Sequence, residues 1–217
     1  MARHIERKIK LVENFTGLDL IVFAAEHYGP EYSNVMKGKL STNLDNVLRS
    51  CYHNRDTRSN LQYGQDLILG WILEDFIIDR LQAPDIIFTK TGADAERKFL
   101  SGSKVTTDSD YKISLEGKQF FVELAHDFNL FWQKREVYHL RDNKLLSLIK
   151  KSEKVPTFIL GISIVDRKCI LKRIHKNMNK EYIEFHPPYK KPAYEIPMPA
   201  EEFYNFDDFN LRILLGK

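Results

Sequence analysis

Hydrophobic residues recur at intervals of three and four along residues 65–82, the spacing that gathers them on one side of an α-helix. The pattern is so rich in apolar residues that we expect the helix to be buried, and Pro84 marks its end. Its apolar positions include Leu67, Ile68, Trp71, Ile72, Phe76, Ile78 and Leu81.

The N-terminal part of the chain shows the same type of pattern in shorter pieces. Residues 8–52 are predicted to be mostly helical, with a break at Gly29 and Pro30 and a new helix after Ser41. The polar stretch 53–60 is predicted to be a loop, because it lacks any apolar periodicity.

Four short runs rich in β-branched and aromatic residues predict strands over residues 85–88, 111–115, 119–125 and 157–165. The second and third runs are separated by Glu116, Gly117 and Lys118, which predicts a hairpin. A helix is predicted over residues 139–151, before the last strand. This order indicates the α/β class, with a mixed central β-sheet flanked by helices.

The chain has 217 residues and shows no internal repeat, low-complexity tract or flexible linker. We therefore expect a single domain, 1–217, with three parts. These are a mainly helical N-terminal part (1–64), a central part with the predicted sheet (65–165), and C-terminal strands followed by an irregular proline-rich arm (166–217).

Features of export or membrane anchoring are not found in the sequence. The basic N-terminus has no apolar segment behind it, and no apolar run reaches the length of a membrane span. Cys51 and Cys169 lie far apart and have no metal-ligand spacing, which suits a reducing compartment better than a disulfide framework. We therefore expect a cytoplasmic protein.

Positive charge is concentrated in one segment, although the net charge is only +3. Residues 134–180 contain 13 Lys and Arg against 4 Asp and Glu, whereas the sequences on either side are each slightly acidic. Such a segment could face the phosphates of a nucleic acid. A solvated basic surface without a partner is the alternative.

Two carboxylates stand out around the predicted hairpin. Asp110 begins its first strand, and Glu123 lies in the middle of its second strand, where the neighbouring residues are all apolar. A tight turn would bring the two acids together, and Mg²⁺ prefers a few carboxylates together with water and substrate phosphate. The alternatives are that Glu123 points to solvent from an edge strand and that Asp110 caps the preceding turn.

The sequence around these acids resembles a known family. Asp110-Tyr-Lys-Ile, a short turn, and Phe121-Val-Glu-Leu-Ala-His126 are similar to the core of the PD-(D/E)XK nucleases, in which an acid opening one strand is followed by Glu-x-Lys on the next. Trp71-Ile-Leu-Glu-Asp75 resembles the helix before that core. His139-Leu-Arg-Asp-Asn-Lys144 resembles the helix that follows Glu-x-Lys in restriction enzymes.

The resemblance extends over residues 65–165 and implies a restriction endonuclease-like fold with this segment as its catalytic core. It implies that Asp110 and Glu123 hold Mg²⁺, with Glu74 from the preceding helix as a further carboxylate. Glu74 pointing to solvent is the alternative.

One position departs from the family pattern, because Ala125 stands where the lysine of Glu-x-Lys is expected. Some members supply that lysine from the next helix, so Lys144 is the first candidate to replace it. Lys112, which shares a strand face with Asp110, is the second candidate. His126 would point to the opposite face of the strand and is a weak candidate.

The resemblance implies a Mg²⁺-dependent endodeoxyribonuclease, specifically a type II restriction enzyme that cuts double-stranded DNA at a short site. Since such enzymes usually cut both strands of a palindrome, it also implies a homodimer. Candidate DNA contacts are Arg55, Arg58, Arg141, Lys172 and Arg173. The alternatives are a repair or junction-resolving nuclease of the same fold and a catalytically inactive nucleic-acid-binding module.

Overall fold

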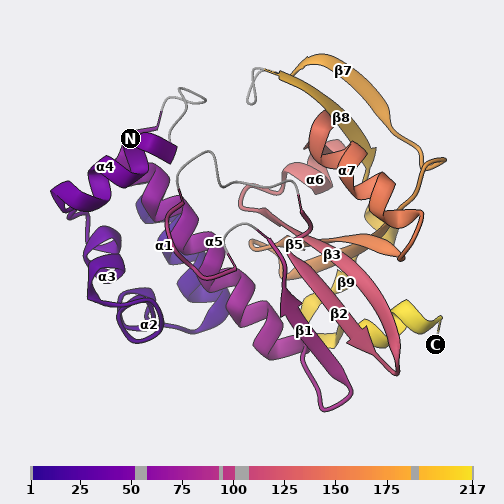
Figure 1. The fold of residues 1–217 in the computed structure, drawn as a ribbon, viewed down its shortest axis with the longest axis horizontal. Helices are drawn as coiled ribbons and strands as arrows, with labels where there is room; N and C mark the ends of the chain where they lie inside the picture. The colour runs from indigo at the N-terminus through magenta and orange to yellow at the C-terminus, as the bar shows by residue number, and fades with distance from the viewer. Residues whose placement is uncertain (1, 52–57, 93–94, 101–107, 187–190, 217) are drawn as a thin grey trace. The chain divides into compact units, whose positions relative to one another are not determined.

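The computed structural model describes residues 2–51, 58–92, 95–100, 108–186 and 191–216 (Figure 1). Contacts divide the chain into two compact units. Unit 1 comprises Met1–Ile77 and Ala93–Thr106, and unit 2 comprises Ile78–Gly92 and Thr107–Lys217. The sequence predicted one domain with a helical N-terminal part. In the structure, the boundary between the two units falls between Ile77 and Ile78, inside a long helix.

Unit 1 is helical in its described residues. Its elements are α1 (Ala2–Thr16), α2 (Leu20–His27), α3 (Pro30–Met36), α4 (Thr42–Cys51) and most of α5 (Asn60–Leu81). The predicted break is confirmed, since Gly29 caps α3 and Pro30 occupies its first turn. Asp19 begins α2 by accepting hydrogen bonds from the backbone N–H groups of Ile21 and Val22 at 3.0 Å.

Trp71 of α5 is the centre of the aromatic packing in unit 1. It is only 1% exposed. The ring centroids of Tyr28, Tyr32 and Phe99 lie 5.9, 6.0 and 5.4 Å from that of Trp71. The prediction that this helix is buried is confirmed, and the helix starts five residues earlier than its apolar pattern, at Asn60.

Unit 2 contains the central sheet, with the strand order β1-β2-β3-β5-β6-β9. The strands are β1 (Ile86–Lys90), β2 (Tyr111–Leu115), β3 (Lys118–Asp127), β5 (Thr157–Ser163), β6 (Lys168–Ile174) and β9 (Tyr204–Asn205). Only the pairing of β3 with β5 is parallel in this sheet. The predicted α/β class with a mixed sheet is therefore confirmed.

The β2–β3 hairpin turns through Glu116 and Gly117, whose φ angles are +47° and +77°. Two successive positive φ angles match the twist of a tight hairpin, and glycine adopts such an angle without strain. The turn fixes the strand register, in which Leu115 pairs with Lys118 and Tyr111 with Val122. Continued by one step, this register places Asp110 beside Glu123.

A second sheet in unit 2 has the order β4-β8-β7, with β4 (Val137–Arg141), β7 (Glu181–His186) and β8 (Lys191–Pro197). The predicted helix 139–151 was therefore wrong at its start: α7 covers Asp142–Ser152. The residues from His139 to Arg141 instead pair with β8, because cross-strand pairing outweighs their weak helical pattern.

The prediction of an irregular arm was wrong for residues 191–197, which form β8. Prolines are tolerated in this strand because Pro197 is its last residue and Pro192 lies where the pairing with β7 shifts register. The remaining elements of unit 2 are α6 (Phe131–Arg135), η2 (Ala200–Glu202), η3 (Phe206–Asp208) and η4 (Leu211–Leu215).

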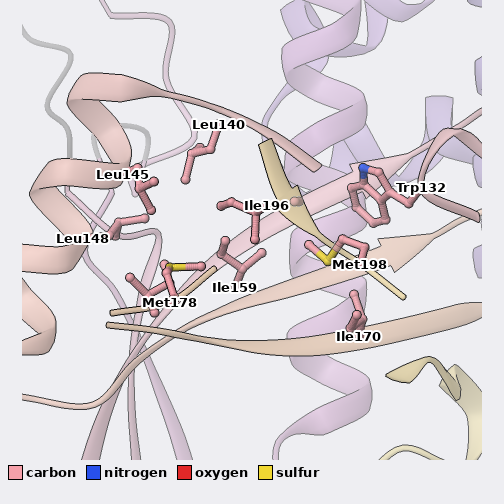
Figure 2. Packing of buried hydrophobic residues seen from close by; sticks show 11 residues of the cluster. Trp132, Leu140, Leu145, Leu148, Ile159, Ile170, Met178, Ile196 and Met198 are labelled. Atoms are coloured by element: carbon pink, nitrogen blue, oxygen red, sulfur yellow. The ribbon is translucent and has the colours of Figure 1, made fainter. Parts of the chain in front are cut away.

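A hydrophobic core holds α7 to the two sheets of unit 2, and we call it the α7 core (Figure 2). Leu145 and Leu148 project from α7 toward Ile159 of β5 and Ile196 of β8. Each fully buried side chain of this size contributes about 1.5–3 kcal/mol to stability. The buried residues of the α7 core, among those that the structure describes, are Ala125, Trp132, Leu140, Leu145, Leu148, Ile159, Ile170, Ile174, Met178, Ile196 and Met198.

Among the helices that the structure describes, none combines the length and the apolar character of a membrane-spanning segment.

Close packing of Trp132 against the backbone of β5 gives a prediction about stability. A Cβ atom at Gly161 would lie 2.9 Å from Cζ3 of Trp132 and 3.0 Å from Cγ2 of Ile170. Gly161→Ala should therefore lower the free energy of unfolding in urea by about 1–3 kcal/mol, the usual cost of overpacking. Gly70→Ala is the control, because nothing lies within 4 Å of its Cβ position in α5. Equal effects of the two substitutions would contradict the packing at Gly161.

Candidate functional site

Asp110 and Glu123 lie beside each other at the start of the β2–β3 pairing. Asp110 directly precedes β2, and its Oδ2 atom accepts a hydrogen bond of 2.8 Å from the backbone N–H of Leu124. Its carbonyl oxygen accepts hydrogen bonds from the N–H groups of Thr91 and Gly92. Asp110 is thus attached to the residues after β1 on one side and to β3 on the other.

Glu123 is a buried carboxylate, only 7% exposed, in the middle of β3. The alternative that it points to solvent from an edge strand is wrong, because β3 is paired on both sides, with β2 and β5. An ionised carboxylate in such a place needs a compensating charge or several hydrogen-bond donors.

Lys144, in the first turn of α7, supplies that charge. Its Nζ atom lies 2.8 Å from Oε2 of Glu123 and 4.0 Å from Oδ1 of Asp110. It also donates a hydrogen bond of 2.6 Å to the carbonyl oxygen of Asp108. The structure therefore brings Asp110, Glu123 and Lys144 together, from positions spread over 35 residues of sequence.

A second lysine of α7 holds the segment before Asp110. Lys151 lies two turns after Lys144, and its Nζ atom is 2.7 Å from Oδ1 of Asp108. The same ammonium lies 4.7 Å from the centroid of the Phe121 ring. Two side chains of one helix thus contact Asp108, one at its backbone and one at its carboxylate.

Ala125, where the resemblance led us to expect a lysine, belongs to the α7 core and is 6% exposed. Asp127, two residues further on, directs its carboxylate to the backbone N–H groups of Asn129 and Trp132, both at 2.9 Å. A lysine at position 125 would have to place its stem among packed apolar side chains. In this chain Lys144 brings an ammonium to Glu123 from the helix instead.

The other two candidates for the lysine role are placed differently. Lys112 lies on β2, where its strand partner is Phe121, two residues before Glu123. His126 is half-buried on β3, where the alternation of a strand points it away from the face of Glu123.

Glu74 is in unit 1, where it belongs to a different cluster of charges. Its Oε2 atom lies 2.7 Å from Nη1 of Arg97, a guanidinium that is 7% exposed. Arg97 also binds Asp75 at 2.6 Å, and Asp75 accepts a hydrogen bond from the hydroxyl of Tyr28. Burial, and then the neighbouring Asp75, raise the pKa of Tyr28 well above its usual value. This arrangement makes Glu74 the counter-ion of a buried arginine.

The predicted DNA contacts differ in their surroundings. Arg58 is paired with Asp66 at 2.6 Å, and Lys172 is paired with Glu202 at 2.8 Å. Arg173 is exposed on β6, and Arg141 is the half-buried N-cap residue of α7. Arg55 lies outside the described residues.

Sequence reasoning missed a chain of three polar residues, each from a different strand of the second sheet. Nε2 of His139 (β4) lies 2.7 Å from Oε1 of Glu195 (β8), and its Nδ1 lies 2.8 Å from Nε2 of His186 (β7). Two histidines 47 positions apart carried no motif. Predicting the pairing of β4, β8 and β7 would have brought them together. The sequence instead predicted a helix at His139 and an irregular arm at Glu195.

In the described part of the chain, no group of three or more His, Cys, Asp or Glu side chains is arranged to hold a metal ion. Comparisons with protein-family models, curated proteins and solved structures gave no match.

Burial of His186 at the end of this chain of polar residues predicts a dependence of stability on pH. Burial, and then the neighbouring His139, lower the pKa of His186 below its usual 6.5, against the opposing effect of Glu195. The unfolded chain therefore takes up a proton near pH 6.5, whereas folded His186 does so only at lower pH. The contribution of His186 is complete above pH 6.5 and is lost as the pH falls through its folded-state pKa.

We therefore expect the free energy of unfolding to fall less steeply below pH 6.5 in His186→Asn than in the wild type. Chemical denaturation at a series of pH values measures this slope. His175→Asn is the control, since His175 is exposed. Parallel curves for the wild type and His186→Asn would show that His186 does not couple folding to protonation.

Proposed function

We propose that this protein is a Mg²⁺-dependent endonuclease acting on double-stranded DNA. The observation that carries the proposal is the position of the Lys144 ammonium, within 4.0 Å of carboxylate oxygens of both Asp110 and Glu123. Two carboxylates can hold a divalent ion for metal-assisted phosphodiester hydrolysis, and an ammonium beside them can stabilise the charge on the reacting phosphate.

The two carboxylates suit Mg²⁺ because this ion keeps several waters and uses few protein ligands. Asp110 and Glu123 would hold it, and when bound it activates water and offsets charge on the phosphate. Asp110 keeps its orientation through the hydrogen bond from Leu124. Lys144 would orient the attacking water or bind a phosphate oxygen. Glu74 as a further ligand has no support from its pairing with Arg97.

The order of these groups agrees with the resemblance to PD-(D/E)XK nucleases. An acid before one strand, a glutamate on the next strand and a lysine on the following helix lie together on a mixed sheet. A restriction endonuclease-like fold is thus part of the proposal, and so is cleavage at a specific site.

DNA as substrate is supported by the surplus of Lys and Arg over residues 134–180, since phosphate contacts dominate the affinity of proteins for DNA. Arg141 and Lys144 belong to this segment and lie at the start of α7. We further propose a homodimer, because a two-fold axis matches the symmetry of a palindromic site. A nuclease that recognises DNA shape differs in cutting branched substrates rather than plain duplex at a fixed sequence.

The metal site gives the first functional prediction. Incubation with long unmethylated DNA should give discrete ends with Mg²⁺ or Mn²⁺ and no cleavage in EDTA. Asp110→Asn and Glu123→Gln should each abolish cleavage while DNA binding is retained, because ligand charge is lost with little change in volume. Gel analysis and sequencing of the ends measure the outcome. Glu153→Gln, an exposed change at the end of α7, should cut normally. Full activity in EDTA would refute the proposal.

The lysine gives the second functional prediction. Lys144→Ala should lower the rate of single-turnover cleavage at saturating protein about 100-fold or more, because the ammonium acts on the reacting groups. Lys112→Ala is the matched comparison, since Lys112 is a half-exposed lysine of β2. Should Lys112→Ala be inactive and Lys144→Ala cut normally, the lysine role would belong to β2.

A further inference from the structure

We propose that the ammonium of Lys144 takes the place of a divalent cation in the metal-free protein, and that cation binding displaces it. The carbonyl oxygen of Asp108 and the carboxylates of Asp110 and Glu123 then form one oxygen site, which we call the Lys144 oxygen site, for either cation. This inference rests on the proposed function, because it concerns the same carboxylates.

The contacts of Lys144 are those of a cation among oxygen ligands. Its Nζ atom has the Asp108 carbonyl at 2.6 Å, Glu123 Oε2 at 2.8 Å and Asp110 Oδ1 at 4.0 Å. The side chains of Lys144, Glu123 and Asp110 are 11%, 10% and 20% exposed. Partial burial strengthens each of these charge interactions relative to bulk water.

The oxygens are held by contacts that do not involve Lys144. Thr91 donates from its hydroxyl to the carbonyl of Ser109 at 2.8 Å, and from its backbone N–H to the carbonyl of Asp110. Lys151 binds the carboxylate of Asp108. Asp110 is further fixed by the N–H of Leu124. The Lys144 oxygen site should therefore persist when the ammonium leaves.

The ammonium and a divalent ion cannot both occupy this site. Mg²⁺ binds oxygen at about 2.0–2.1 Å. An ion on Oε2 of Glu123 would lie close to an ammonium that is 2.8 Å from the same atom, and the two positive charges would repel each other. Because lysine has a long flexible stem, its ammonium can turn from the carboxylates toward a substrate phosphate.

Exchange of the two cations predicts that removal of Lys144 strengthens the binding of a divalent ion. Removal of a residue that only positions the carboxylates would weaken it. If it competes with the cation, Lys144→Met should bind Mn²⁺ about tenfold or more tightly, since one charge interaction at this separation is worth at least that factor. The same variant should melt at a lower temperature without metal and gain more from added Mn²⁺ than the wild type.

The experiment is a titration of the full chain with Mn²⁺ alone, without DNA. Calorimetry measures the binding affinity, and thermal melting measures the stability with and without the ion. Lys150→Met is the matched control, because it removes one exposed charge from the same helix. It should bind Mn²⁺ as the wild type does. Lys144→Gln is a second variant that keeps a hydrogen-bond donor for the Asp108 carbonyl and so maintains folding if Lys144→Met does not.

Tighter binding by Lys144→Met or Lys144→Gln, with Lys150→Met unchanged, supports the exchange. Equal or weaker binding by the Lys144 variants overturns it but leaves the proposed nuclease intact, because the wild type still binds the ion. If neither the wild type nor the variants bind Mn²⁺, the metal site of the proposed function fails as well.

Discussion

A carboxylate in the interior of a sheet needs a compensating positive charge. In this protein Lys144 of α7 supplies that charge to Glu123. The ion pair between Glu123 and Lys144 spans 2.8 Å, and both side chains are about nine-tenths buried. Removing one partner of such a pair costs about 3–5 kcal/mol, because the other charge is left without compensation. The ion pair thus holds α7 to β3, because the charge of Glu123 has to stay beside Lys144.

Several features of unit 2 contribute to this one contact. The tight turn at Glu116 and Gly117 sets the register that places Asp110 beside Glu123. The α7 core packs Leu145 and Leu148 of the helix against Ile159 of β5. Lys144, in the first turn of the same helix, contacts Glu123 of β3. Position 125 is then free to be a small apolar residue of that core. Fold stability and candidate chemistry therefore depend on the same packing.

The sequence was sufficient for the hairpin and for the buried part of α5, because both depend on local pattern. The hairpin register also accounts for the proximity of Asp110 and Glu123. Lys144 was selected through the family resemblance, and the catalytic roles of the three residues stay predictions. The sequence was insufficient where the partner is distant. His139 lies in a strand because β8, more than 50 residues later, pairs with it. Glu74 pairs with Arg97, a contact without a periodic or motif signal. Such pairings are decided by tertiary structure, which overrides weak local preferences.

If an ammonium and a divalent cation use the same oxygens beside Asp110, Glu123 and Lys144, a bound ion should displace the ammonium. Anomalous diffraction from crystals soaked in Mn²⁺ tests it most directly. We expect a peak within coordination distance of the carboxylates of Asp110 and Glu123, with the Lys144 ammonium moved away from Oε2 of Glu123. A peak at other residues, or an occupied site with the ammonium still 2.8 Å from Glu123, would contradict it.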